Sequence, residues 1–310
     1  MNKLTKIGAT ALAGSLVAFS VNAAEMSVSG GASITYNNSG ADVTNDNITM
    51  GDSLNFSASG ETDGGLMITS KMEIDGGAED DHSITIAGDF GTLVFDGHGG
   101  SSALGAVDDK SPIAYEESWD VVSGADTNNI NGNGQNNMFI YTSNDMNGVT
   151  ATVSYVQSSA TSVNSGMELA LAYTPDGMEG LTLGFAMGED ESAASTSVDE
   201  QVIYATYTSG PVSVGMTTSE SDTTASTGDK EFTSAGVTYA VNDDFSIGYH
   251  VSTLETTDIS SDSDQESSGF SFSYTSGGMT LAGAVNDVEN IGFAGTDDRD
   301  GAEIGVSFAF

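Results

Sequence analysis

Histidine is the one side chain that ordinarily changes charge near neutral pH, and this chain has three: His82, His98 and His250. No His-Glu-x-x-His sequence occurs, so the spacing typical of a zinc hydrolase is absent. Serine and aspartate are abundant, so counting alone leaves open a hydrolase that uses one histidine with a nearby acid. Nothing next to the three histidines supports that alternative. Cysteine is absent, which removes thiol nucleophiles, cysteine metal sites and disulfides. We therefore expect that the protein is not an enzyme.

Carboxylates are the most abundant reactive groups. The chain has 45 Asp and Glu against 6 Lys and Arg, which gives a formal net charge of −39. Such a polyanion is not expected to bind nucleic acid, because phosphate contacts need Lys and Arg. It should attract cations, although an acidic surface suited to a salty medium would look the same. Clustered acids could hold Ca²⁺ weakly through oxygen ligands, without the spacing of an EF-hand; they are Asp258, Asp262, Asp264, Asp297, Asp298 and Asp300. No other cofactor is expected.

The first residues resemble a secretory signal. Lys3 and Lys6 precede an apolar stretch over residues 7–21, and Val21-Asn22-Ala23 offers a small-x-small cleavage site. This pattern predicts a signal peptide over residues 1–23 and a mature chain over 24–310 that forms a single domain. The apolar stretch is too short for a membrane helix, and no later stretch is long enough for one.

Apolar and polar residues alternate along most of the mature chain, which is the period of a β-strand. The last stretch is the clearest example: Ala302, Ile304, Val306, Phe308 and Phe310 share one face, and Glu303 lies on the other. A soluble sandwich places such an apolar face inside, whereas a membrane barrel turns it toward lipid. Alternation alone therefore leaves both architectures open.

The connections between the alternating segments favour the barrel. Short and long connections alternate along the chain, which predicts sixteen strands, with residues 25–36 pairing with the last strand. Short turns on one rim and long loops on the other are typical of an all-β, antiparallel, up-and-down transmembrane barrel. The expected long connections are 37–47, 75–82, 96–137, 158–166, 189–199, 219–230, 255–267 and 287–300.

With this pattern, the chain resembles the general porins of the Gram-negative outer membrane, of the trimeric 16-stranded kind found in alphaproteobacteria. Three segments carry the resemblance: Met-Ser-Val-Ser-Gly-Gly at 26–31, Gly-Asp-Phe-Gly-Thr-Leu-Val-Phe-Asp-Gly at 88–97, and the terminal strand with Phe308 and Phe310. The resemblance implies a homotrimer in outer-membrane lipid and a water-filled channel for passive diffusion of small hydrophilic solutes and ions. It also implies that the barrel-assembly machinery reads the terminal strand as its signal.

The same resemblance implies that the third long connection, 96–137, folds into the barrel and narrows the pore. Its acids would line the constriction: Asp108, Asp109, Glu116, Glu117, Asp120 and Asp126, opposite Lys71 and Glu73 of the wall. In the family such acids face a cluster of bases, but strand bases are nearly absent here. We therefore expect a mainly negative constriction that prefers cations, although each acid could simply be solvated.

Two alternatives remain open. One is a substrate-selective channel of the same shape. The other is a secreted, acidic, β-rich adhesin or surface-layer protein without a channel, which explains the signal, the acidity and the strands. It does not explain the alternating connection lengths or the terminal phenylalanine.

Overall fold

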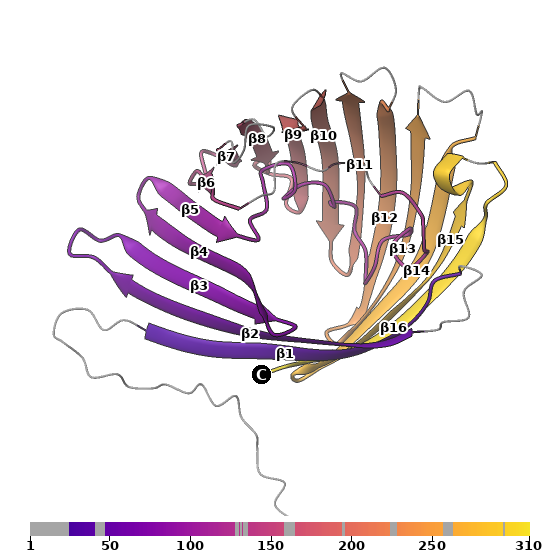
Figure 1. Cartoon of the computed structure of the whole chain (residues 1–310), viewed down its shortest axis with the longest axis horizontal. Coiled ribbons are helices and arrows are strands. Elements are labelled where there is room, and N and C mark those ends of the chain that lie inside the picture. Colours follow the sequence, from indigo (N-terminus) through magenta and orange to yellow (C-terminus); the bar gives the residue numbers. More distant parts are fainter. Residues whose placement is uncertain are drawn as a thin grey trace, which may run out of the picture.

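The computed structural model describes residues 25–40, 47–127, 130, 132, 136–157, 165–193, 196–223, 228–256, 263–293 and 295–310. In these residues the chain forms a closed barrel of sixteen antiparallel strands (Figure 1). Each strand pairs with its neighbours in the sequence, and β1 (Glu25–Asn38) pairs with β16 (Arg299–Ala309). No helix in the described part is long and apolar enough to cross a membrane. The expected all-β, up-and-down barrel is confirmed.

The remaining strands follow in chain order around the barrel. They are β2 (Asn47–Glu61), β3 (Met67–Asp75), β4 (Ala78–Gly88), β5 (Gly91–His98), β6 (Met138–Thr142), β7 (Val149–Val156), β8 (Gly166–Tyr173), β9 (Leu181–Ala193), β10 (Thr196–Ser209), β11 (Val212–Thr223), β12 (Lys230–Asn242), β13 (Phe245–Thr256), β14 (Gln265–Ser276) and β15 (Met279–Glu289). A short 3-10 helix, η1 (Ile291–Phe293), precedes β16.

The barrel closes where the first strand meets the last. Ile34 lies opposite Val306 and Tyr36 lies opposite Ile304, so the predicted pairing of the first and last strands is confirmed. At the end of the chain the Phe310 N–H donates to the carbonyl of Gly30 at 2.9 Å, and the Gly30 N–H donates back at 3.2 Å. The last residue therefore completes the hydrogen-bond ladder that joins the two strands.

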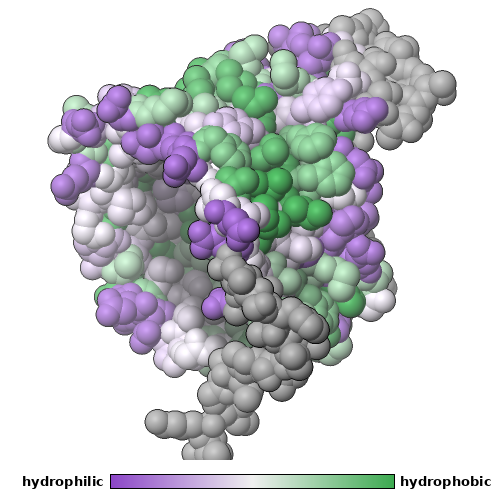
Figure 2. Space-filling model, turned by 90° about the vertical axis from the view of Figure 1, so that its left-hand side faces the viewer, coloured by the Kyte–Doolittle hydropathy of each residue, from purple (hydrophilic) through white to green (hydrophobic). Residues whose placement is uncertain are grey.

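Many large apolar residues of the strands face outward. Ile34, Leu54, Ile84, Phe270 and Ile304 are 44% exposed or more, which is the inverse of a soluble sandwich and matches a wall that faces lipid. Figure 2 shows one side of the molecule, on which hydrophobic residues gather in a patch with hydrophilic residues around it. Serine, glycine and threonine take the alternate, inward positions of the same strands, because that face borders water.

The connection expected over residues 75–82 was predicted wrongly. It is a tight turn of Gly76 and Gly77 between β3 and β4, with φ angles of 54° and 84°. A two-residue hairpin of this kind requires positive φ at both positions, which glycine adopts readily. The 189–199 segment also differs, since β9 continues to Ala193 and β10 begins at Thr196. Polar residues in this segment obscure the alternation that marks a strand in the sequence. The backbone pairing of β9 with β10 nevertheless continues through them.

Candidate constriction of the channel

The chain between β5 and β6 returns into the barrel and lies along its inner wall. We call residues 99–137 the inner loop. In Figure 1 it runs inside the barrel from β5 toward β16. Its backbone begins by donating to inward side chains: the Leu104 N–H to Glu168 Oε2 at 2.8 Å, and the Ala103 N–H to Ser154 Oγ at 3.0 Å. Glu168 is 1% exposed, so a buried strand carboxylate anchors the start of the inner loop. This confirms the expected inward-folded third loop.

An apolar cluster supports the first part of the inner loop. Leu104 packs with residues of β8, β9 and β10, including Ala186, Val202 and Tyr204. The Gly132 N–H, on the returning part of the inner loop, donates to Glu200 Oε2 of β10 at 2.9 Å. Apolar contacts and buried hydrogen bonds therefore hold this part of the inner loop against the wall.

Glycines on the inner face of the wall make room for the middle of the inner loop. A Cβ atom at Gly248 would lie 2.9 Å from the backbone nitrogen of Ala114, and one at Gly301 would lie 2.5 Å from the carbonyl oxygen of Val121. Cβ contacts under 3.0 Å essentially never occur. The same closeness to the inner loop is found at Gly215 and Gly236, and a Cβ atom at Gly269 would lie 3.1 Å from the Cα of Ser118. We call these five glycines of β11 to β14 and β16 the glycine track. Only a wall without side chains at these positions admits the inner loop so closely.

A buried polar network joins Ser118 of the inner loop to the inner faces of β13 and β14. Ser118 Oγ is 2.8 Å from His250 Nδ1 and 2.6 Å from Ser267 Oγ. Ser252 Oγ lies 2.6 Å from the same Ser267 hydroxyl. Next to this network the indole of Trp119 stands edge-on to the His250 ring, with 5.5 Å between the ring centres. His250 is 1% exposed, so it holds the inner loop in place and is closed to a substrate.

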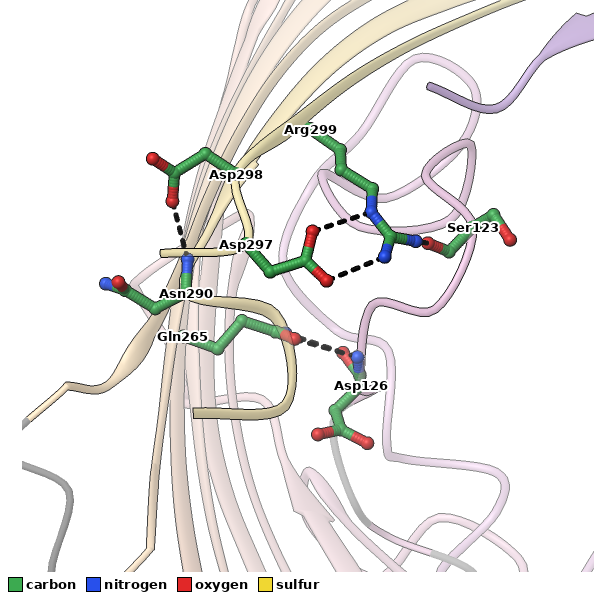
Figure 3. Close-up of polar contacts among 7 residues, drawn as sticks. All are labelled: Ser123, Asp126, Gln265, Asn290, Asp297, Asp298 and Arg299. Carbon is green, nitrogen blue, oxygen red and sulfur yellow. Dashed lines mark hydrogen bonds and ion pairs between the residues drawn. The ribbon is translucent and has the colours of Figure 1, made fainter. Parts of the chain in front are cut away.

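The end of the inner loop is tied to β16 and β14. Arg299 pairs with Asp297 through Nε at 2.8 Å and Nη2 at 2.6 Å, and its Nη1 donates to the carbonyl of Ser123 at 2.6 Å (Figure 3). The Asp126 N–H donates to Gln265 Oε1 at 2.8 Å, and the amide of Gln265 donates to the Asp126 carbonyl at 2.9 Å. A paired guanidinium and a reciprocal amide pair thus fix the last turn before the chain leaves the barrel.

Three of the acids expected at the constriction come together. The carboxylates of Glu116, Glu117 and Asp120 each offer an oxygen within 4.8 Å of the others, and we call them the acidic tip. Burial raises the pKa of Glu117 to about 9, and the hydrogen bond and charge of Asp120 add to the effect. Burial and the same Asp120 charge also raise the pKa of Glu116. Carboxylates this close resist ionising together, so Glu117 holds its proton at neutral pH.

A wall carboxylate faces the acidic tip from β16. Tyr115 Oη donates to Glu303 Oε1 at 2.6 Å, and Asn37 Nδ2 donates to Glu303 Oε2 at 2.7 Å. Burial and this hydrogen bond raise the pKa of Tyr115 above its usual value. Glu303, Glu168 and His250 were not expected as site residues. The visible signal was an isolated charge or histidine on a strand face that is otherwise Ser, Thr and Gly.

The inner faces of β2, β3 and β4 border the remaining opening, because the wall contacts of the inner loop described above fall on β7 to β16. There Asn55 Nδ2 donates to Glu73 Oε1 at 3.1 Å, and Lys71 and Asp75 are exposed. Lys71, Glu73 and Asp75 of β3 point into the barrel, because the alternate positions, Met72 and Ile74, point outward. Residues 25–98 contain one lysine and no arginine. The opening therefore has carboxylates on its wall as well as on the inner loop.

The other expected site residues are more scattered. The Asp109 N–H donates to Asp108 Oδ1 at 3.0 Å, earlier in the inner loop than the acidic tip. Asp126 is held beside Gln265 and lies apart from the acidic tip. Phe308 and Phe310 face outward at 38% and 71% exposure, and their reading as an assembly signal stays a prediction.

The acids proposed for Ca²⁺ do not form one cluster in the described residues. Asp297 is neutralised by Arg299, and Asp298 Oδ1 accepts the Asn290 N–H at 3.1 Å (Figure 3). Asp264 contributes its backbone carbonyl to the amide of Asn290 at 3.0 Å, and Asp300 faces Asp287 across the strands. Asp258 and Asp262 lie outside the described residues, as does the expected signal peptide over 1–23. Calcium binding at these acids stays a prediction.

Comparisons with known proteins agree with this geometry. The Gram-negative porin family matches residues 8–275, and no curated protein matches the sequence. Among solved structures, an anion-selective porin from Comamonas acidovorans has 17% identity, covers 93% of this chain and 100% of its own, and gives a TM-score of 0.69. OmpT of Vibrio cholerae has 13% identity, 94% and 99% coverage, and a TM-score of 0.72. A mutant of the Rh. blastica porin has 18% identity, 92% and 100% coverage, and a TM-score of 0.65.

A closed 16-stranded barrel, an inner loop that lies against its inner wall, and a family match over most of the chain point the same way. They do not favour a secreted adhesin without a channel, nor an enzyme. The chain belongs to the Gram-negative porin family and is a channel-forming protein of the outer membrane.

Proposed function

We propose that this porin is a cation-preferring diffusion channel for small hydrophilic solutes. Sixteen strands enclose an aqueous interior, and the inner loop would set the size limit. The single observation behind the cation preference is that both sides of the opening are acidic. The acidic tip lies on the inner loop, Glu73 and Asp75 lie on the wall, and Lys71 is the one Lys or Arg in the described parts of β2, β3 and β4.

The sign of the electrostatic potential in the opening follows from these charges. A narrow opening lined by one sign of charge concentrates counter-ions and repels co-ions. Because the pKa of Glu117 is raised to about 9, the wall carboxylates and Glu303 would supply much of the negative charge there. The fold does not decide selectivity, since an anion-selective porin from Comamonas acidovorans has the same architecture. Selectivity must therefore come from the residues at the opening.

The test is the reversal potential of the purified porin in a planar bilayer under a KCl gradient. We expect the sign that corresponds to cation preference, and a smaller potential in the double variant Glu73→Gln, Asp75→Asn. Asp176→Asn is the matched control, because Asp176 lies in the turn between β8 and β9, away from the opening. Anion preference in the wild-type channel would refute the proposal, as would equal effects of the control and the wall variant.

Two further parts of the proposal rest on resemblance to the general porins. The channel would be a homotrimer, and the barrel-assembly machinery would recognise the terminal strand. Crosslinking of the detergent-extracted porin tests the first part, and a monomer in native membranes would contradict it. The second part is tested below by deletion of Phe310.

A further inference from the structure

Two of the three histidines lie side by side at the rim of the barrel where the inner loop begins. His82 of β4 pairs with His98, which is the last residue of β5. Their ring centres are 6.4 Å apart, and the two ring planes differ by only 14°. The side chain of His82 is 48% exposed, and His98 is partly exposed. The contacts that hold the inner loop in place use neither ring, so the pair is open to another role.

A β-bulge brings the two rings together. Ser83 of β4 pairs with Asp96 of β5. The preceding residue, His82, pairs with His98 and skips Gly97, which is therefore an extra residue in β5. Without this extra residue, strand alternation would direct His98 to the opposite face of the wall. A Cβ atom at Gly97 would collide with Nε2 of His82, so glycine keeps the space beside that nitrogen open.

Hydrogen bonds determine which nitrogen of each ring is available. His82 Nδ1 lies 2.6 Å from Glu79 Oε1, and His98 Nδ1 pairs with the backbone carbonyl of Asp80. Both partners only accept hydrogen bonds, so each Nδ1 carries the proton and the neutral ring keeps its lone pair on Nε2. In the described part of the chain neither Nε2 has a hydrogen-bond partner. Metal-binding histidines are oriented in this way, since their other ring nitrogen donates to a carboxylate or a backbone carbonyl.

We propose that His82 and His98 together bind one divalent transition-metal ion, of which Zn²⁺ and Cu²⁺ are the best matches. Imidazole nitrogen suits these two ions, whereas Ca²⁺ and Mg²⁺ prefer oxygen ligands. A tetrahedral Zn²⁺ at about 2.1 Å from each Nε2 would place the ring centres about 5.3 Å apart, so the rings must close by about 1 Å from their separation of 6.4 Å. Small rotations of two partly exposed side chains are sufficient for this. Water completes the coordination, so the ion exchanges with the medium.

The surroundings of the histidine pair favour a cation. Glu79, Asp80 and Asp81 precede His82 in β4, and β4 and β5 contain no Lys or Arg. Carboxylates beside a site raise the local concentration of cations. Two imidazoles bind zinc more weakly than the three or four side chains of catalytic and structural zinc sites. The ion is therefore held reversibly, and it fastens the start of the inner loop to β4 because the inner loop follows His98 directly.

Copper and zinc binding to the purified porin in detergent tests this inference. The electron paramagnetic resonance spectrum of added Cu²⁺ should show coupling to two imidazole nitrogens. Calorimetric titration with Zn²⁺ should show one site per chain that excess Ca²⁺ does not displace. His82→Gln and His98→Gln should each lower the Zn²⁺ affinity at least tenfold and remove one of the two nitrogens from the Cu²⁺ spectrum. Glu79→Gln, which weakens the orientation of the His82 ring, should cause a smaller loss of affinity.

Glu179→Gln is the matched control, because it removes one carboxylate from an exposed turn and should leave the Zn²⁺ affinity unchanged. A ligand that binds only the folded state raises the melting temperature, so Zn²⁺ should stabilise the wild type and Glu179→Gln but not His98→Gln. Wild-type conductance in each variant shows that the barrel has folded. Absence of nitrogen coupling in the Cu²⁺ spectrum would overturn the inference. So would Zn²⁺ binding that persists in both histidine variants or that excess Ca²⁺ removes, since carboxylates would then be the ligands.

Discussion

A methyl group added at Gly301 should push the inner loop away from the wall. Its Cβ would lie 2.5 Å from the carbonyl oxygen of Val121 and 3.0 Å from Val122 Cγ2, and ordinary contact begins at 3.4 Å. The backbone of the inner loop must therefore withdraw by roughly 1 Å to reach a normal contact distance. Gly301 itself cannot move as far, because it pairs with Asn286 of β15 and the next residue, Ala302, pairs with Asn38 of β1. The displacement is directed into the lumen, toward the opening that conducts.

The expected results of Gly301→Ala are a lower single-channel conductance and a less stable barrel. Overpacking of this kind costs about 1–3 kcal/mol, here because the hydrogen bonds beside Val121 must stretch. Conductance is measured in planar bilayers, and stability by heat-induced loss of the folded band in detergent.

Gly31→Ala is the matched control for this prediction. Gly31 is an inward glycine of β1 on the uncovered side, where a Cβ would meet Phe308 O at 3.5 Å and Ser53 Oγ at 3.8 Å. Both are ordinary contacts, so this variant should conduct and melt like the wild type. If Gly301→Ala and Gly31→Ala had the same conductance and stability, the inner loop would not be seated on the glycine track and the reasoning would fail.

Three further changes test other parts of the structure. Glu117 is protonated at pH 7 and gains its charge as the pH rises through about 9, so cation preference should increase over roughly pH 7 to 10. The reversal potential should then change much less with pH in Glu117→Gln. Deletion of Phe310 removes the backbone pair with Gly30 and should lower the amount of porin in the membrane far more than the conductance of the channels that assemble, as measured by immunoblot and bilayer recording. Glu168→Ala leaves the buried Leu104 N–H without its acceptor, which should lower the unfolding free energy by about 1–3 kcal/mol in detergent.

Each of these changes has an outcome that contradicts it. An equal pH response of wild type and Glu117→Gln would show that the acidic tip does not contribute to the field. Normal membrane levels after deletion of Phe310 would remove its role in assembly. Unchanged stability of Glu168→Ala would mean that this carboxylate does not hold the inner loop, and Glu179→Ala in an exposed turn provides the baseline.

The barrel itself could be predicted because its signals are local. Alternation along residues 301–310 shows which side chains share a face, and the spacing of turns shows how strands follow one another. The prediction failed at residues 75–82, where two glycines form a tight hairpin. Glycine pairs indicate a turn but do not reveal how far the polar strands on either side continue.

The position of the inner loop against the barrel wall could not be predicted in the same way. Tyr115 meets Glu303 and Val121 meets Gly301 across nearly two hundred positions of sequence. A loop can approach a strand glycine closely only if it covers that part of the wall. The alternation of residues along a strand does not show which part of the wall a distant loop covers. A solvated acid and an acid of the acidic tip also look alike in sequence, because the neighbours that shift their pKa values come from the fold.

By itself, then, the sequence determined the class of protein: an exported, acidic, sixteen-stranded barrel that closes through its last strand. Only the tertiary structure decided which half of the wall is covered, which acids face the opening, and which wall glycines lie against the inner loop. Strand formation follows from alternation between neighbours in the chain. Pore shape and outer surface follow from side chains that meet only after the barrel has closed.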